Sequence, residues 1–247
     1  MRRRGWIAVG AVALLLLVGA GATLAWSGAE APAPAGDGSA VAEAGPRPLT
    51  ADEAERLAVA RFLAYRDGSR TFETAVPTAD GTVTLRGRFD HRGGVGIATA
   101  VLDGESAVIT WDDALFVGWT GAGSGEEVPT APPASPGAAR PLDPTESSID
   151  AVLVLLLNLG ADRPDNAQLL ETSDARWLRG DDVDGTAVDV FSGPTDAASG
   201  AAGGTTRFWI DESGALRRFE ADLPAGAVSI DLNPEEHVAV PRAPELG

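Results

Sequence analysis

The 247-residue sequence contains no cysteine, no lysine and only two histidines, His91 and His237. Without cysteine the chain forms no disulfide and no thiolate metal site, so a folded core must supply the stability of any exported part. Neither histidine has a neighbour spaced for a metal site or for a nucleophile, and we expect both side chains to be exposed to solvent. We therefore expect no metal and no cofactor.

The short motifs of common catalytic sites are also missing. There is no Gly-x-Ser-x-Gly, Ser-x-x-Lys or His-Glu-x-x-His sequence. The acidic residues 181–185 resemble part of a calcium loop, but Phe191 stands where the final glutamate of such a loop would lie. A hairpin turn is the better interpretation of this segment. Since no cluster of titratable residues indicates an active site, we expect the protein not to be an enzyme.

Basic residues are few beyond the N-terminus. With Arg2, Arg3 and Arg4 set aside, 16 arginines face 36 acidic residues, which leaves a formal charge of −20. Proteins that bind nucleic acid or anionic lipid headgroups need basic surfaces, so we expect neither kind of contact for this part of the chain. Solubility is the simplest explanation of the acidic charge, and binding of cations or of a basic partner is the alternative.

Long apolar runs are absent except at the N-terminus. Residues 5–26 carry no charge and directly follow three arginines. About 20 apolar residues in a helix cross the hydrocarbon core of a bilayer, and the arginines favour a cytoplasmic N-terminus. We expect an uncleaved membrane anchor, because Leu24 and Trp26 interrupt the small residues that a cleavage site requires. A cleaved signal sequence, which would release a secreted protein, is the alternative.

The remaining sequence divides by composition. Residues 27–48 are rich in Ala, Pro and Gly and cannot bury enough apolar surface to fold. A capping-box pattern, Thr50 followed by Glu53, then predicts a helix through about Tyr65. The expected organisation is an anchor or signal (1–26), a linker (27–48), one extracytoplasmic domain (49–242) with a Pro/Gly-rich surface loop (120–144), and a tail (243–247).

Alternating apolar residues predict an antiparallel sheet. Residues 82–89 alternate cleanly, and residues 95–101 and 106–119 repeat the pattern. The pair Asp103-Gly104 predicts a type I′ hairpin turn. Such alternation in successive short segments is typical of an antiparallel meander with one buried face.

Residues 149–159 predict a helix that is too short to span a bilayer, and its residues 151–157 are apolar all the way round. Such a helix must be buried on all sides, and a second short helix is expected to begin at residues 163–165. The fold predicted is α+β, with a curved, mainly antiparallel sheet (a half-barrel) that wraps apolar helices, preceded by one N-terminal transmembrane helix. The residues expected to line an apolar hollow between sheet and helix are Val95, Ile97, Ile109, Trp111, Leu115, Val117, Leu153, Leu156 and Leu157.

The hairpin at residues 207–221 carries the motif W-I-D-x-x-G-x-L-R-R-x-E. It resembles a strand pair of the LppX/LprG mycobacterial lipoproteins and the LolA-type lipoprotein carriers, and residues 184–188 and 228–232 follow in the matching order. The resemblance extends over roughly residues 49–240. The chain resembles an actinobacterial, membrane-anchored member of this group, one without the lipid-attachment cysteine. The resemblance implies an extracytoplasmic lipid-carrier fold, and it assigns no role to individual residues.

Two functions are compatible with these features. The first is a membrane-anchored extracytoplasmic binding protein that holds a lipid or another apolar ligand in the hollow between sheet and helix. The alternative is a non-enzymatic cell-envelope interaction or sensory domain with a filled core, whose acidic surface meets a protein partner. The expected partners are thus the cell membrane, through residues 5–26, and a lipid ligand, with no nucleic acid.

Overall fold

The computed structural model describes residues 45–123, 125, 127–195, 206–234 and 240, which all belong to one compact unit spanning Ala42–Gly247. The expected anchor, most of the expected linker and the tail at residues 243–247 lie outside the described residues, as does His237. In the part of the chain that is described, no helix combines the length and the apolar character needed to cross a bilayer.

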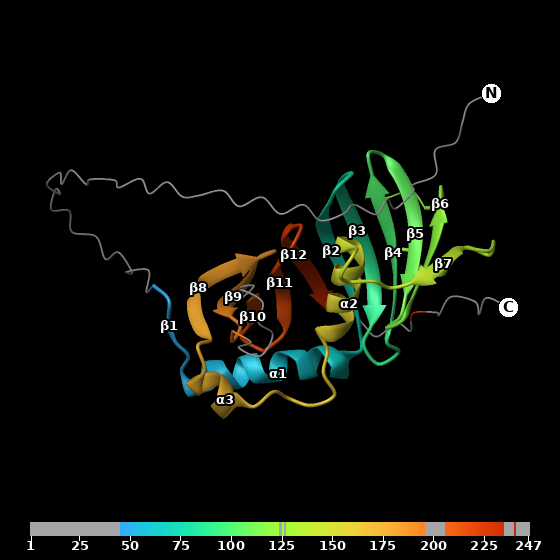
Figure 1. Cartoon of the computed structure of the whole chain (residues 1–247). Helices are drawn as coiled ribbons and strands as arrows, with labels where there is room; N and C mark the ends of the chain where they lie inside the picture. Colours follow the sequence, from blue (N-terminus) through green and yellow to red (C-terminus); the bar gives the residue numbers. More distant parts are fainter. Residues whose placement is uncertain (1–44, 124, 126, 196–205, 235–239, 241–247) are drawn as a thin grey trace, which may run out of the picture. The chain divides into compact units, whose positions relative to one another are not determined.

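The described residues form one twelve-stranded antiparallel sheet with the strand order β1-β8-β9-β10-β11-β12-β2-β3-β4-β5-β6-β7. The sheet is open and curved (Figure 1), which confirms the expected α+β class and the mainly antiparallel curved sheet. The strands are β1 (Arg47–Pro48), β2 (Ser69–Thr78), β3 (Gly81–Asp90), β4 (Val95–Leu102), β5 (Glu105–Trp111), β6 (Leu115–Thr120), β7 (Ala138–Pro141), β8 (Arg176–Val183), β9 (Thr186–Ser192), β10 (Arg207–Asp211), β11 (Leu216–Leu223) and β12 (Gly226–Pro234). The helices are α1 (Ala51–Asp67), α2 (Ser148–Asn158) and α3 (Ala167–Thr172).

The helix α1 begins at the predicted capping box. The Thr50 hydroxyl accepts a 3.4 Å bond from the Glu53 amide, and the Glu53 carboxylate accepts a 2.9 Å bond from the Thr50 amide. Arg47 donates two 2.7 Å bonds to the same carboxylate and stacks 4.4 Å from the centre of the Trp177 ring. Arg47 and Pro48, the last described residues of the segment expected to be a linker, pair with β8 as the strand β1.

The three helices lie on one face of the sheet, which we call the inner face. The helix α1 contacts β2, β10 and β11, α2 contacts β2, β3 and β4, and α3 packs on α1 (Figure 1). The chain before α3 runs along α1, since the amides of Ala161 and Asp165 donate to α1 carbonyls. These bonds delay the start of the helix to Ala167, capped by Asn166, so the predicted start at residues 163–165 is wrong.

The proline-rich segment 120–144 is more than a surface loop. Residues 138–141 pair with β6 as the edge strand β7. The indole of Trp119 on β6 donates a 2.7 Å bond to the Ser135 carbonyl, so the segment folds back over the other face of the sheet, which we call the outer face. Val240 from the C-terminal region is buried in the same outer cluster as Trp119.

Candidate functional site: the helix α2 on the inner face

One side of α2 is tightly packed on the sheet. Ser147 caps the helix by accepting a 3.2 Å bond from the Asp150 amide. Val152, Leu153 and Leu156 are completely buried. The Trp111 indole of β5 donates a 3.2 Å bond to the Leu153 carbonyl. The predicted burial of the helix is confirmed for this side.

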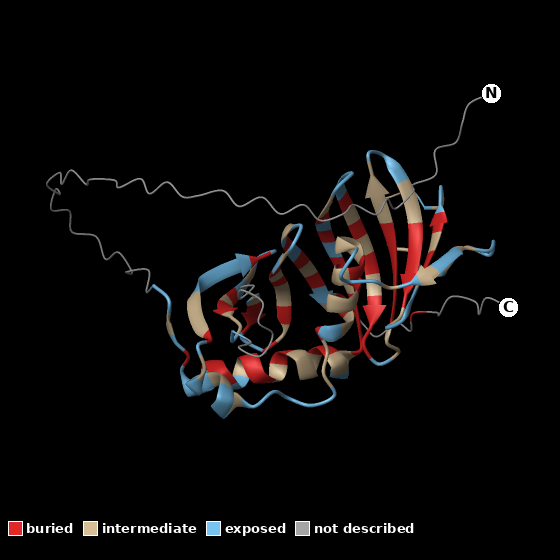
Figure 2. Ribbon diagram, in the orientation of Figure 1, coloured by how far each residue is buried: buried red, intermediate tan, exposed pale blue. Residues whose placement is uncertain are grey.

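The opposite side of α2 is only half-buried by the described residues. Ala151, Val154, Leu155 and Leu157 are of intermediate exposure, and the helix is not red all round in Figure 2. The expectation that α2 is buried on all sides is therefore wrong. No polar side chain occurs in residues 151–157, although the solvent side of a surface helix is normally polar. The inner face thus presents an incompletely covered apolar helix side.

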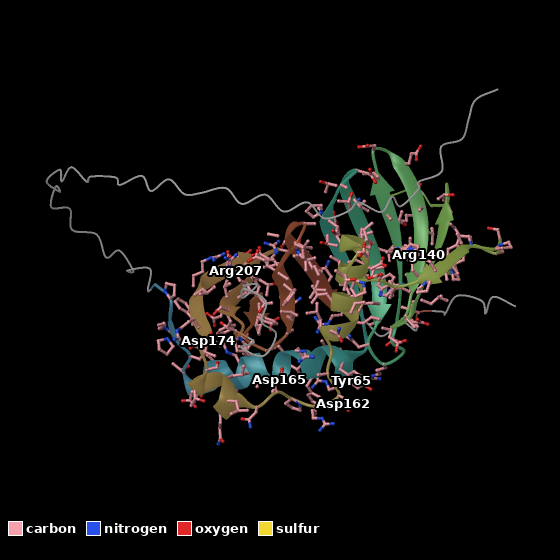
Figure 3. The ribbon with its side chains drawn as sticks, in the orientation of Figure 1. Tyr65, Arg140, Asp162, Asp165, Asp174 and Arg207 are labelled. Atoms are coloured by element: carbon pink, nitrogen blue, oxygen red, sulfur yellow. The ribbon has the colours of Figure 1, made fainter. Side chains whose placement is uncertain are left out.

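The N-terminal end of α2 is fixed to the sheet edge by a buried ion pair. Asp150 is completely buried, and Arg140 of β7 donates bonds of 2.5 Å and 2.7 Å to its carboxylate (Figure 3 labels Arg140). The Asp143 amide adds a 2.8 Å bond to the same carboxylate. The Arg140 guanidinium also stacks 4.3 Å from the centre of the Phe116 ring. Because its charge is compensated, the buried carboxylate holds the first turn of α2 in one position.

The C-terminal end of α2 is held by His91, which follows β3. His91 is 8% exposed, its Nδ1 lies 3.3 Å from the Leu157 carbonyl oxygen, and its ring meets the Phe89 ring at 4.8 Å. A Cβ atom at Gly160 would lie 2.5 Å from the imidazole, so only glycine fits after the helix. The expectation that His91 is exposed is wrong, because the end of α2 covers it.

The His91 contacts predict a loss of stability in mild acid. Burial lowers the pKa of His91 to about 4 from an ordinary value of 6.5. Between these pH values the unfolded chain binds a proton that the folded protein does not, so stability falls as pH decreases. We expect this residue to reduce the free energy of unfolding by about 2 kcal/mol between pH 7 and pH 5. Urea unfolding at several pH values measures the slope.

Because the chain has only two histidines, single substitutions can show which of them causes the pH dependence of stability. His91→Phe keeps a ring against Phe89 and should flatten the dependence between pH 7 and pH 5. His237→Gln removes the other histidine and measures how much of the slope that residue contributes. An unchanged slope in His91→Phe would show that other groups cause the acid sensitivity.

The nine residues predicted to line a hollow do not lie together. Five are on the α2 side of the sheet, in or against its main core: Ile109, Trp111, Leu153, Leu156 and Leu157. Val95, Ile97 and Val117 belong to a separate outer-face cluster around Trp119. Leu115 lies two residues before Val117 on β6 and is 37% exposed. For these last four, the expectation that they face α2 is wrong.

The strand β4 explains why the prediction chose the wrong face. The register pairs Gly96 with the inner-face residue Phe89, so Val95 and Ile97 point to the outer face. Glycine is required at this position because a Cβ atom there would lie 2.1 Å from the Trp111 ring. Both faces of β4 are apolar, and the larger side chains are on the outer one. Alternation in hydrophobicity alone therefore predicts that the outer face, with its larger side chains, meets α2. In the structure the segment 120–137 covers that face instead.

The acidic residues 181–185 form the expected hairpin turn. Asp184 and Gly185 have φ angles of 51° and 78° and connect β8 to β9. Asp181 accepts 3.0 Å bonds from the Trp209 indole and from Arg179 on the outer face. Within the described ranges, no three His, Asp or Glu side chains are arranged to hold a metal ion.

The hairpin that carries the family motif is a structural element. The Asp211 carboxylate accepts bonds from the amides of Ser213 and Ala215 at 2.9 Å and 3.0 Å, and from Arg217 at 2.8 Å. Gly214 adopts the positive φ of 85° that closes the turn. The conspicuous motif residues thus build the β10–β11 turn, while the half-buried apolar side of α2 has no short sequence motif.

The described fold has similar solved structures. Lipoprotein LppX of Mycobacterium tuberculosis is 13% identical with a TM-score of 0.44, over 77% of this chain and 98% of that one. LprF from Mycobacterium bovis is 15% identical with a TM-score of 0.42, over 78% and 96%. A domain of Vibrio parahaemolyticus assigned to outer-membrane lipoprotein sorting is 13% identical with a TM-score of 0.27, over 73% and 89%.

No protein-family model and no curated protein matches the chain. The expected likeness to LppX/LprG and LolA-type proteins is found among the solved structures. These similarities concern the fold and assign no ligand or activity to this chain.

Proposed function

We propose that this protein is a membrane-anchored extracytoplasmic binding protein that holds an apolar chain, such as a lipid, along the half-buried side of α2. The observation that carries this proposal is the apolar side formed by Val154, Leu155 and Leu157, which the described residues cover only in part. Apolar surface left uncovered on a soluble domain commonly marks a binding site. Residues 5–26 would tether the domain to the membrane.

The inner face of the sheet around α2 is also apolar. The side chains that pack partly buried against the main core include Phe208 and Leu223 of β10 and β11, and Leu102 and Phe116 of β4 and β6. Such side chains are in contact with the core and still reach solvent. An apolar ligand gains free energy from them in proportion to the area that it removes from water. We further propose that the protein is not an enzyme.

The proposal predicts that the domain carries lipid and that Leu155 contributes to its binding. The unit from residue 42 onward, purified and extracted with organic solvent, should release lipid detectable by mass spectrometry. It should also take up a fluorescent long-chain probe. Leu155→Gln should weaken probe binding about tenfold, because a half-buried leucine contributes about 1.4 kcal/mol.

The matched control for this experiment is Leu169→Gln. Leu169 is 68% exposed on α3, so the same substitution there should leave probe binding unchanged. Absence of extracted lipid together with absence of probe uptake would contradict the proposal.

A filled-core interaction domain is the second candidate function. The complete burial of Val152, Leu153 and Leu156, with the Trp111 bond to the helix backbone, favours tight packing between α2 and the sheet. In that case the acidic chain, with a formal net charge of −17, would meet a basic protein partner. This function becomes the better one if the lipid experiment gives the negative result.

A further inference from the structure

The inner face contains a buried cation that the described residues compensate only in part. Arg70 on β2 is 1% exposed. Its Nη1 donates a 2.8 Å bond to the Leu216 carbonyl, and its Nη2 lies 3.5 Å from Asp67. Arg66 donates to the same Asp67 carboxylate, which divides that negative charge between two arginines. The Arg70 Nε has no hydrogen-bond partner among the described residues.

A second polar atom without a partner lies close to this cation. The His91 Nε2 is buried and has no hydrogen-bond partner among the described residues, while Nδ1 faces the Leu157 carbonyl. Arg70 is the cross-strand neighbour of Phe89, and the His91 ring packs against the same Phe89 ring. The positive charge of Arg70 also acts on His91, so the two residues lie in the same region of the inner face, next to Phe89.

The charged groups around the two residues leave the positive charge of Arg70 only partly compensated. Near His91 these are Arg70 of β2, Asp90 of β3 and Arg61 of α1. Near Arg70 these are Asp67 of α1, Arg217 of β11 and Asp211 of β10, whose carboxylate already accepts four hydrogen bonds within its own turn and from Arg217. A buried guanidinium with incomplete pairing is costly, and an accepting anionic oxygen would relieve that cost.

We propose that Arg70 and His91 form a polar subsite at the C-terminal end of α2 that accepts the carboxylate of a long-chain acid. One carboxylate oxygen accepts from the Arg70 Nε, and the other accepts from the His91 Nε2 once that atom carries a proton. The acyl chain then lies along the half-buried side of α2. This inference rests on the proposed function and adds the headgroup of the ligand to it.

Two consequences distinguish this subsite from a purely structural pair of residues. A carboxylic acid should bind more tightly than an alcohol of the same chain length, because only the acid supplies a negative charge to Arg70. Binding should also take up protons near neutral pH, because a carboxylate beside His91 favours the imidazolium form. A pair that served only for packing would produce neither effect.

The test compares decanoic acid with decanol on the full chain in neutral detergent micelles. Isothermal titration calorimetry at pH 7, with the acid added as its ionised decanoate salt and in two buffers of different ionisation enthalpy, gives the affinity and the number of protons bound. We expect the acid to bind at least tenfold more tightly than the alcohol, with net proton uptake. Arg70→Met should abolish this preference, and His91→Phe should abolish the uptake, whereas Arg163→Met on the 84% exposed Arg163 side chain should change neither.

The possible outcomes separate the two proposals. If the acid and the alcohol bind equally, or if binding takes up no protons, the subsite is refuted while apolar binding stands. If neither compound binds, the proposed function itself fails. If circular dichroism shows that Arg70→Met does not fold, the subsite is tested by the unmodified chain alone, through its preference for the acid and its proton uptake.

Discussion

Leu156→Asp is expected to abolish folding of the domain. Leu156 is completely buried between α2 and the inner face of the sheet. The substitution removes a packed side chain, which costs about 2–5 kcal/mol, and leaves a carboxylate without a partner in apolar surroundings. Together these costs match the whole stability of a typical domain, which is about 5–15 kcal/mol. Circular dichroism and urea unfolding of the purified variant provide the measurement.

The control for this variant is the same change at an exposed leucine. Leu169→Asp on α3 places the carboxylate at a position that is 68% exposed, where solvent can hydrate it. We expect this variant to unfold within about 0.5 kcal/mol of the unmodified domain. Native strand content in Leu156→Asp would show that α2 does not pack on the sheet as described.

Gly96→Ala is expected to reduce the free energy of unfolding by about 3 kcal/mol. The added methyl group would start 2.1 Å from the Trp111 ring, far inside van der Waals contact. The indole cannot retreat without breaking its 3.2 Å bond to the Leu153 carbonyl and displacing α2. Urea unfolding measures the loss, and we expect Gly96→Ala to weaken apolar probe binding as well.

Another strand glycine supplies the comparison for this prediction. A Cβ atom at Gly180 on β8 would meet nothing within 4 Å, so Gly180→Ala should change stability by no more than about 0.5 kcal/mol. Combining Gly96→Ala with Trp111→Phe should restore part of the loss, since the smaller ring leaves space for the methyl group. Equal effects of the two glycine substitutions would contradict the close approach of Trp111 to β4.

Local sequence patterns determined most of the elements of this protein. The Thr50–Glu53 capping box starts α1, and the Asp103-Gly104 pair closes a hairpin with φ angles of 51° and 82°. The apolar run within residues 149–159 forms α2. In each case the deciding interactions join residues a few positions apart, so the amino-acid sequence alone contains the information.

Only the tertiary structure decided which side of each element meets which neighbour. The pairing of β12 with β2 joins the strands that follow α2 to those that precede it. Because Gly96 has no side chain, the Trp111 ring can lie against the inner face of β4, and the end of α2 buries His91. These outcomes depend on strand register and on segments distant in sequence, because a side chain is buried only when another part of the chain covers it.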